Sequence, residues 1–209
     1  MEEKKEIQDL LIGEQLRDLS FLWIKPAEVE QPYRDLLCHE HDMTSTLAEF
    51  HGGEVELQIF EEGSDSDCYF REVLLRVGDK PVEYGLIRIF LGNFPTGLWS
   101  AVTEGRKPLG AILNESGLEY FSRPGGFLKI SGKTFQPDFF PSTGGGFLFG
   151  RYNELVSVDK TVFARIIEIL PKENDVAVFS SMIFHGSVIN KTLLERLYRQ
   201  WSSMNCLIK

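Results

Sequence analysis

The sequence predicts an α+β fold in which a single antiparallel β-sheet has helices packed on one side or at its ends. Two observations support this. Segments with strand-like alternation outnumber helical ones, and most connections between strands are too short for the crossovers that parallel strands require. The chain of 209 residues is long enough for a sizeable core and fits one domain, residues 1–209.

The N-terminal part is predicted to be helical. Residues 3–18 carry apolar side chains at helical spacing, and a second helix is expected at about 32–38. Asp42 offers N-cap chemistry for a third helix through Phe50, which the pair Gly52-Gly53 ends.

Three consecutive strands are expected next. Residues 55–61 alternate apolar and polar side chains, and the polar stretch 63–67 forms a loop. Residues 69–77 and 82–90 then form a hairpin around a turn at 78–81, whose composition is Gly-Asp-Lys-Pro.

The following segment alternates turns with short elements. A proline starts a short helix over 95–104, and GRKPLGAIL at 105–113 is a turn that enters another helix. Residues 118–131 are expected to form a hairpin turned at Pro124-Gly125-Gly126. Residues 132–146, rich in Gly, Pro and Phe, are expected to form a loop or flap.

Two long strands, 147–158 and 161–170, are predicted to follow, turned at Asp159-Lys160. A short strand at 176–180 and a terminal helix at 190–201 complete the chain. The sequence shows no internal repeat and no sign of a second domain.

Three predicted strands each place one charge, Arg71, Arg88 or Glu168, among apolar residues of the same parity. Because side chains alternate across a strand, these charges are expected to point inward, and hairpin pairing can bring Arg71 and Arg88 to one face. A buried charge needs a partner. Two interpretations are open: a salt bridge within the sheet, or a pocket in which arginine binds a ligand carboxylate and Glu168 faces the ligand's other end.

Composition restricts the classes of partner. The net charge of −9 argues against broad binding to nucleic acid or acidic membranes, since both need a basic surface. A small anionic ligand stays compatible, because local charge sets pocket affinity. The N-terminal stretch MEEKKEIQDLL is charged and has no apolar core of signal-peptide length, so no signal peptide is expected. No apolar run reaches membrane length, and Cys38, Cys68 and Cys206 are too few and scattered for a disulfide framework. A cytoplasmic location is therefore expected.

The stretch CHEH at 38–41 invites a metal interpretation through Cys38, His39 and His41. No second cluster supplies the remaining ligands, and the two histidines share a face only in extended backbone, so helix-cap chemistry is preferred and no metal is expected. No glycine-rich stretch forms a phosphate-binding loop, and no cofactor is expected.

Taken in order, five motifs resemble the chorismate pyruvate-lyase family and its chorismate lyase-like relatives. Individually the motifs are short and moderately specific, whereas their shared order and spacing is much more specific. The resemblance covers about residues 35–171 and leaves a C-terminal tail, 172–209. The matching stretches are DMTSTLAEFHGGEVELQIFEEG (42–63), YFREVLLRVGDKPVEYGL (69–86), KPLGAIL (107–113), FGRYNEL (149–155) and IIEILP (166–171).

The resemblance implies elimination of pyruvate from chorismate to give 4-hydroxybenzoate, without cofactor or metal, on an antiparallel sheet whose helical flaps close an internal pocket. It places the ring carboxylate on Arg71. The backbone amides of Met43 and of Leu109, which precedes Gly110 in the PLG turn, help to hold that carboxylate. The resemblance also implies that Glu168 contacts the hydroxyl or ether oxygen at the other end of the ligand. Arg71 and Glu168 are thus the candidate catalytic residues, with Glu168 as a hypothetical proton donor.

This chain departs from the family's pattern at one binding position. Lyases of the family often carry a second arginine where this chain has Leu86, and Arg88, two residues further on, is a candidate replacement. Two non-enzymatic alternatives remain. One is a domain on the same fold that binds or senses an aromatic carboxylate without catalysis, and the other is an inactive protein whose tail recruits a partner.

Overall fold

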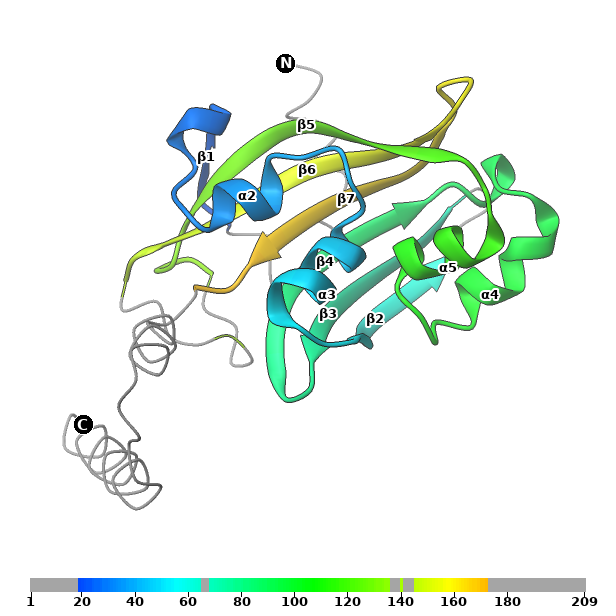
Figure 1. Cartoon of the computed structure of the whole chain (residues 1–209), viewed down its shortest axis with the longest axis horizontal. Coiled ribbons are helices and arrows are strands. Elements are labelled where there is room, and N and C mark those ends of the chain that lie inside the picture. Colours follow the sequence, from blue (N-terminus) through cyan, green and yellow to red (C-terminus); the bar gives the residue numbers. More distant parts are fainter. Residues whose placement is uncertain (1–18, 65–67, 136–139, 141–144, 173–209) are drawn as a thin grey trace, which may run out of the picture. The chain divides into compact units, whose positions relative to one another are not determined.

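The computed structural model describes residues 19–64, 68–135, 140 and 145–172. Their centre is a seven-stranded antiparallel sheet in the order β1-β5-β6-β7-β4-β3-β2 (Figure 1). The predicted α+β class with one antiparallel sheet is confirmed. The strands are β1 (Phe21–Ile24), β2 (Val55–Ser64), β3 (Tyr69–Val77), β4 (Lys80–Ile89), β5 (Tyr120–Ser131), β6 (Phe147–Ser157) and β7 (Val162–Leu170).

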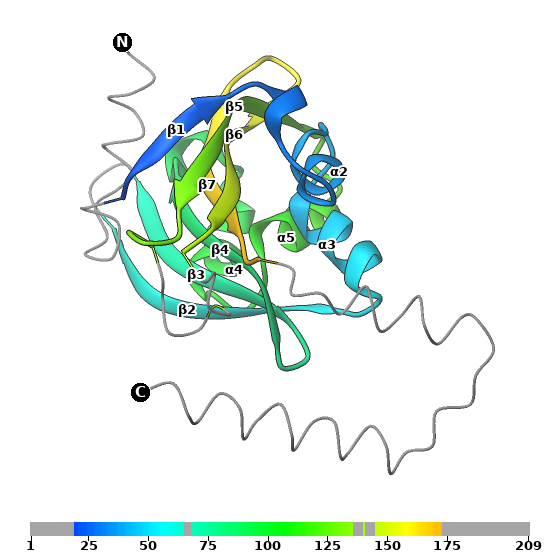
Figure 2. The same cartoon turned by 90° about the vertical axis from the view of Figure 1, so that its left-hand side faces the viewer.

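The helices are short and lie on one side of the sheet. Figure 2 shows α2, α3 and α5 together beside the same face, as the sequence predicts. None of the described helices is long and apolar enough to cross a membrane. The α-helices are α2 (Tyr33–Leu37), α3 (Met43–His51), α4 (Trp99–Thr103) and α5 (Leu109–Ser116), and the 3-10 turns are η2 (Pro26–Glu28), η3 (Leu91–Asn93) and η4 (Thr96–Leu98).

The boundaries of α3 and α5, the two helices next to the site, lie at residue types that commonly begin or end helices. The Asp42 carboxylate accepts a hydrogen bond from the Ser45 N–H at 2.8 Å and so caps the start of α3. Gly52 and Gly117 end α3 and α5 in the left-handed region, at φ 68° and 70°, where glycine carries no steric penalty.

The segment 118–131 is not the predicted hairpin. It forms a single long strand, β5, which pairs with β6 along its length, and Pro124 and Gly125 mark a bulge in the pairing. The two glycines are needed because the Tyr152 ring lies against Gly125 and the Trp23 ring lies against Gly126, where a β-carbon would clash. The strand β1, which sequence reasoning missed, supplies Trp23 and pairs with β5.

The sheet is buried on both faces, and this decides where each charged residue points. On the helix face, Val73, Ile87 and Ile166 pack with residues of α4 and α5. On the back face, Tyr84 and Ile167 pack with other apolar side chains. Residues that pair across neighbouring strands share a face, so each pairing assigns a side chain to one of the two.

The sequence suggested that Arg88 could lie beside Arg71 on one face of the sheet. The pairing of the strands shows that it does not. Arg71 pairs with Ile87 and lies on the helix face, whereas Arg88 pairs with Phe70 and with Arg165 on the back face. Alternation could not reveal this, because the even-numbered and odd-numbered residues of β4 are both largely apolar. The predictions for 3–18, 176–180, 190–201 and much of 132–146 lie outside the described residues.

Candidate functional site

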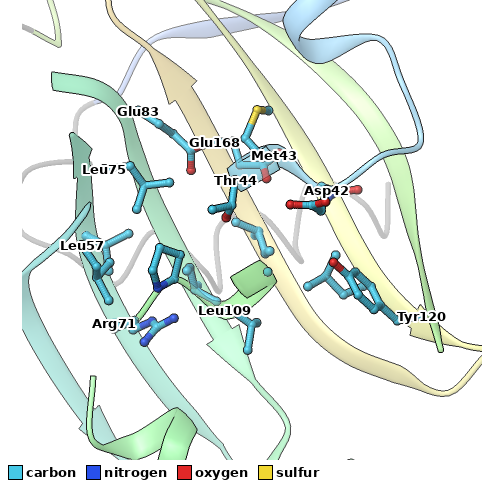
Figure 3. Close-up of a pocket in the computed structure, with 17 residues that line it drawn as sticks. Asp42, Met43, Thr44, Leu57, Arg71, Leu75, Glu83, Leu109, Tyr120 and Glu168 are labelled. Carbon is cyan, nitrogen blue, oxygen red and sulfur yellow. The ribbon is translucent and has the colours of Figure 1, made fainter. Parts of the chain in front are cut away.

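A pocket lies between the helix face of the sheet and the N-terminal ends of α3 and α5 (Figure 3). Its walls are mostly apolar, with polar groups at the two ends. The sheet contributes Leu57, Arg71, Val73, Leu75, Glu83, Tyr120, Asn153, Leu155, Ile87, Ile166 and Glu168, and the helix starts contribute Asp42, Met43, Thr44, Pro108, Leu109 and Gly110.

The pocket is narrow. Its cavity volume is about 40 Å³. Small-molecule sites commonly have about 300–1,000 Å³ of space. The cavity is therefore much smaller than a typical small-molecule site, and it excludes a ligand larger than about a single ring.

Arg71 supplies a positive charge to the pocket wall. Its side chain is 1% exposed, and among the described residues none of its three guanidinium nitrogens has a hydrogen-bond partner. Burial lowers the pKa of Arg71, while the nearby Tyr69 and Glu62 act in the opposite direction. The Tyr69 hydroxyl donates its own hydrogen bond to Glu62 at 2.5 Å. A buried guanidinium in this state is poised to bind an anion.

Two helix starts face the same space as Arg71. The first N–H groups of a helix have no partner within it and carry partial positive charge, so Met43 and Leu109 begin helices whose ends favour an anion. Gly110 allows the two starts to come together, since a β-carbon there would lie 3.0 Å from the Thr44 Oγ1 and 3.2 Å from the Asp42 Oδ1.

The other end of the pocket holds a buried ion pair between Glu168 on β7 and Arg151 on β6. Arg151 donates from Nε and from Nη2, the latter at 3.4 Å, to the two oxygens of Glu168. Its Nη1 donates to the carbonyls of Leu37 at 3.0 Å and His39 at 3.1 Å. This arginine therefore fixes Glu168 and also ties the end of α2 to the sheet.

Glu83 on β4 is a second buried carboxyl at this end. It is 3% exposed, and its Oε2 has no partner among the described residues. Burial raises the pKa of Glu83 well above its ordinary value, the Glu168 carboxylate adds to that effect, and Arg151 opposes it. The carboxyl group of Glu83 is thus stabilised in its neutral form.

The mouth of the pocket carries a chain of polar contacts. The Tyr120 hydroxyl donates to the side-chain Oδ1 of Asn114 at 2.9 Å, and the side-chain Nδ2 of Asn114 donates to the Asp42 carboxylate at 3.4 Å. Deeper in the wall, Ser122 donates to the Asn153 side chain at 3.1 Å.

The structure brings together five residues that the family resemblance implied: Arg71, Met43, Leu109, Gly110 and Glu168 all line this one pocket. Arg88 does not line it. Sequence reasoning missed three polar residues of the same face, namely Glu83, Arg151 and Asn153. Arg151 and Asn153 had a usable signal, because they share parity with the apolar Phe149 and Leu155.

The CHEH stretch has other contacts. The His39 Nε2 lies 2.7 Å from the Leu36 carbonyl, and its Nδ1 accepts from the His41 N–H at 3.2 Å. Within 19–64, 68–135, 140 and 145–172, no group of three or more His, Cys, Asp or Glu side chains is placed to hold a metal ion.

Comparison with known proteins gives no family. No family model matches the chain, and no curated protein matches it. Several solved structures are similar in part. The ligand-binding domain of a protein described as a GntR-family transcriptional regulator from Bordetella bronchiseptica gives a TM-score of 0.41 at 12% identity, over 57% of this chain and 87% of that one.

A regulator from Escherichia coli CFT073 gives a TM-score of 0.40 at 12% identity, over 56% of this chain and 96% of that one. A GntR-family transcriptional regulator from Bacillus cereus gives 0.39 at 19% identity, over 58% and 94%. Likenesses at these TM-scores carry no information about what this chain binds.

Proposed function

We propose that this protein binds a small aromatic carboxylate in the pocket between the sheet and the starts of α3 and α5. The observation that carries the proposal is Arg71, a fully buried guanidinium whose nitrogens are without partners among the described residues. A ligand carboxylate supplies the missing acceptors, and the starts of the two helices favour the same negative charge.

The rest of the pocket suits a ring. Leu75, Ile87, Leu155 and Ile166 provide apolar walls between the two polar ends. The five residues implied by the resemblance to chorismate lyase-like proteins meet here, which supports an aromatic or cyclohexadienyl carboxylate, such as 4-hydroxybenzoate or chorismate, as the ligand class.

Binding is tested by titrating the purified protein with benzoate and with 4-hydroxybenzoate in a calorimeter. Arg71→Met is expected to weaken binding at least about tenfold, since charge-assisted hydrogen bonds contribute about 1.5–3 kcal/mol each. Arg76→Met, on the same strand but outside the pocket, is the matched control. No binding by the parental protein, or equal binding by Arg71→Met, overturns the proposal.

A second candidate is the lyase reaction itself. The observation in its favour is that the carboxyl groups of Glu83 and Glu168 lie at the end of the pocket opposite Arg71 (Figure 3). We assign the ether oxygen of chorismate to that end. Elimination of pyruvate makes the ring aromatic, so positioning and electrostatics can carry the chemistry. Incubation with chorismate, followed by assay of 4-hydroxybenzoate and pyruvate, tests this candidate. Activity that survives unchanged in Glu168→Ala excludes Glu168 as its proton donor.

A further inference from the structure

Resting on the proposed function, we infer that Glu83 is a neutral hydrogen-bond donor that selects monocarboxylates bearing an uncharged oxygen at the end remote from Arg71. Neither the family resemblance nor the pattern of the sequence points to this residue. The inference names the ligand class more closely: one carboxylate, one ring, and a hydroxyl, ether or carbonyl oxygen opposite the carboxylate.

Position is the first argument. On the paired strands β3 and β4, Arg71 lies opposite Ile87 and Leu75 lies opposite Glu83, so the two charged residues are four positions apart on one face. Four residues of strand span about 13 Å. Both side chains line the same pocket, and that span leaves room for a single ring with one substituent at each end.

Charge is the second argument. The inner end contains two carboxyl groups, Glu83 and Glu168, but one guanidinium, Arg151. The hydrogen bonds of Arg151 go to Glu168 and to the carbonyls of Leu37 and His39. Glu83 receives none of them, and a buried carboxyl without a cationic partner is stable only when it carries a proton.

Local packing is the third argument. A β-carbon at Gly85 would lie 3.0 Å from the Val73 Cγ2 and 3.2 Å from the Glu83 Oε1, so the Glu83 carboxyl occupies the space that a side chain at 85 would fill. Gly85 pairs with Glu168 on the next strand. The glycine therefore lets the two carboxyl groups approach each other at the end of the pocket.

These charges define the ligand. With Glu83 neutral and Glu168 paired to Arg151, the remaining charge of the four buried groups is the positive charge of Arg71, which one ligand carboxylate neutralises. The half-buried Asp42 carboxylate also lines the pocket, where it accepts a hydrogen bond from a backbone N–H at the start of α3. A neutral hydroxyl can accept from Glu83 and donate to Glu168. A second carboxylate would face Glu168 without a free cation among the buried residues of the pocket, and so would be rejected. The same reasoning makes the dianion chorismate a poorer ligand than 4-hydroxybenzoate.

The test compares three ligands of one ring by calorimetry: benzoate, 4-hydroxybenzoate and benzene-1,4-dicarboxylate. For the parental protein we expect 4-hydroxybenzoate to bind at least about fivefold more tightly than benzoate, and the dicarboxylate to bind at least about tenfold more weakly than 4-hydroxybenzoate. Glu83→Leu should remove the preference, so that the ratio of the affinities for 4-hydroxybenzoate and benzoate falls to about one. Glu83→Gln, whose amide is also a neutral donor, should keep the preference.

Glu72→Gln is the matched control, because Glu72 is also a buried glutamate with a raised pKa but lies one residue from Arg71 on the opposite face. Equal preference for 4-hydroxybenzoate in the parental protein and Glu83→Leu overturns the role of Glu83 while leaving the proposed function intact. Tight binding of the dicarboxylate overturns it as well. Failure of all three ligands to bind overturns the proposed function and this inference together.

Discussion

Arg151 holds both oxygens of Glu168 and at the same time donates to the carbonyls of Leu37 and His39. One side chain, 0% exposed, therefore connects β6, β7 and the end of α2. The Glu168 carboxylate is held in place by the protein before any ligand arrives, whereas Arg71 is not. This difference between the two ends of the pocket leads to several measurable consequences.

Replacing Arg71 by methionine should remove ligand binding and stabilise the unliganded protein. The guanidinium is buried without hydrogen-bond partners among the described residues, and an apolar side chain of similar length avoids that desolvation penalty. We expect the free energy of unfolding in urea to rise by about 1–3 kcal/mol. Arg76→Met, outside the pocket, should not produce this rise. A less stable Arg71→Met protein contradicts the interpretation of Arg71 as an unsatisfied ligand-binding group.

Replacing Arg151 by methionine should destabilise the protein strongly. The change leaves Glu168 as a buried charge without its cation, which typically costs about 3–5 kcal/mol in the free energy of unfolding. The double variant Arg151→Met with Glu168→Leu should recover a large part of that loss, because no charge is then stranded. Denaturant titration of the two single variants and the double variant measures the coupling.

The exposed pair Lys107–Glu115 is the control for this cycle. Their side chains are 54% and 60% exposed, and Lys107 Nζ lies 2.6 Å from the Glu115 carboxylate. Exposed ion pairs contribute about 0–1 kcal/mol, so Lys107→Met should change stability little. Equal losses from Arg151→Met and Lys107→Met would show that burial of the Arg151–Glu168 pair has no energetic consequence.

Glu83 should make the protein less stable as pH rises. Its pKa is raised in the folded state, so between the ordinary carboxyl pKa and the raised one the folded chain holds a proton that the unfolded chain has lost. Stability from this group is therefore complete at low pH and is lost as pH increases. The groups whose charge acts on Glu83 are Glu168 on β7, which raises its pKa, and Arg151 on β6, which lowers it.

The measurement is the free energy of unfolding of the parental protein and of Glu83→Gln between about pH 5 and 8. The advantage of Glu83→Gln should widen as pH rises, because glutamine has no proton to lose. Glu56→Gln, at an exposed position of β2, is the surface control. A constant difference for Glu83→Gln would mean that Glu83 is ionised alike in the folded and unfolded chains.

Asp42 should be replaceable by asparagine but not by alanine. Its carboxylate caps α3 through the Ser45 N–H, and loss of such a cap costs about 0.5–2 kcal/mol in the free energy of unfolding. Asparagine retains the acceptor and removes a negative charge from the pocket wall. Asp42→Asn should therefore stay within a few tenths of a kcal/mol of the parental stability and bind benzoate at least as tightly. Chemical unfolding and calorimetry check the two expectations.

The sequence was informative about elements and about one set of charges. Strand alternation located β3, β6 and β7 closely, and Asp42 with Gly52 marked α3. Arg71 and Glu168 could be identified as inward charges because their strands carry apolar residues of the same parity. A sheet buried on one face would have allowed every charge to be placed in this way.

In β4 both faces are buried, so alternation alone could not show on which face a charged residue lies. The even-numbered Tyr84 and Leu86 pack on the back face, and the odd-numbered Ile87 and Ile89 pack on the helix face. Parity alone assigned Arg88 to the pocket and overlooked Glu83, and only the pairing register distinguishes them. The predicted hairpin at Pro124 was wrong for a related reason. A bulge and a turn have the same local composition, and which of them forms depends on the distant Trp23 and Tyr152.

Arg71, whose guanidinium has no hydrogen-bond partner among the described residues, also connects the cellular level of the protein to the supply of its ligand. A ligand whose carboxylate accepts hydrogen bonds from Arg71 stabilises the folded chain by mass action. The gain is about 2.7 kcal/mol when the ligand concentration is 100 times its Kd. Degradation in cells commonly follows the population of transiently unfolded chains, so occupancy should lengthen the lifetime of the protein. The cellular level of this chain would then rise with the supply of its carboxylate, an effect that Arg71→Met should abolish in a pulse-chase measurement.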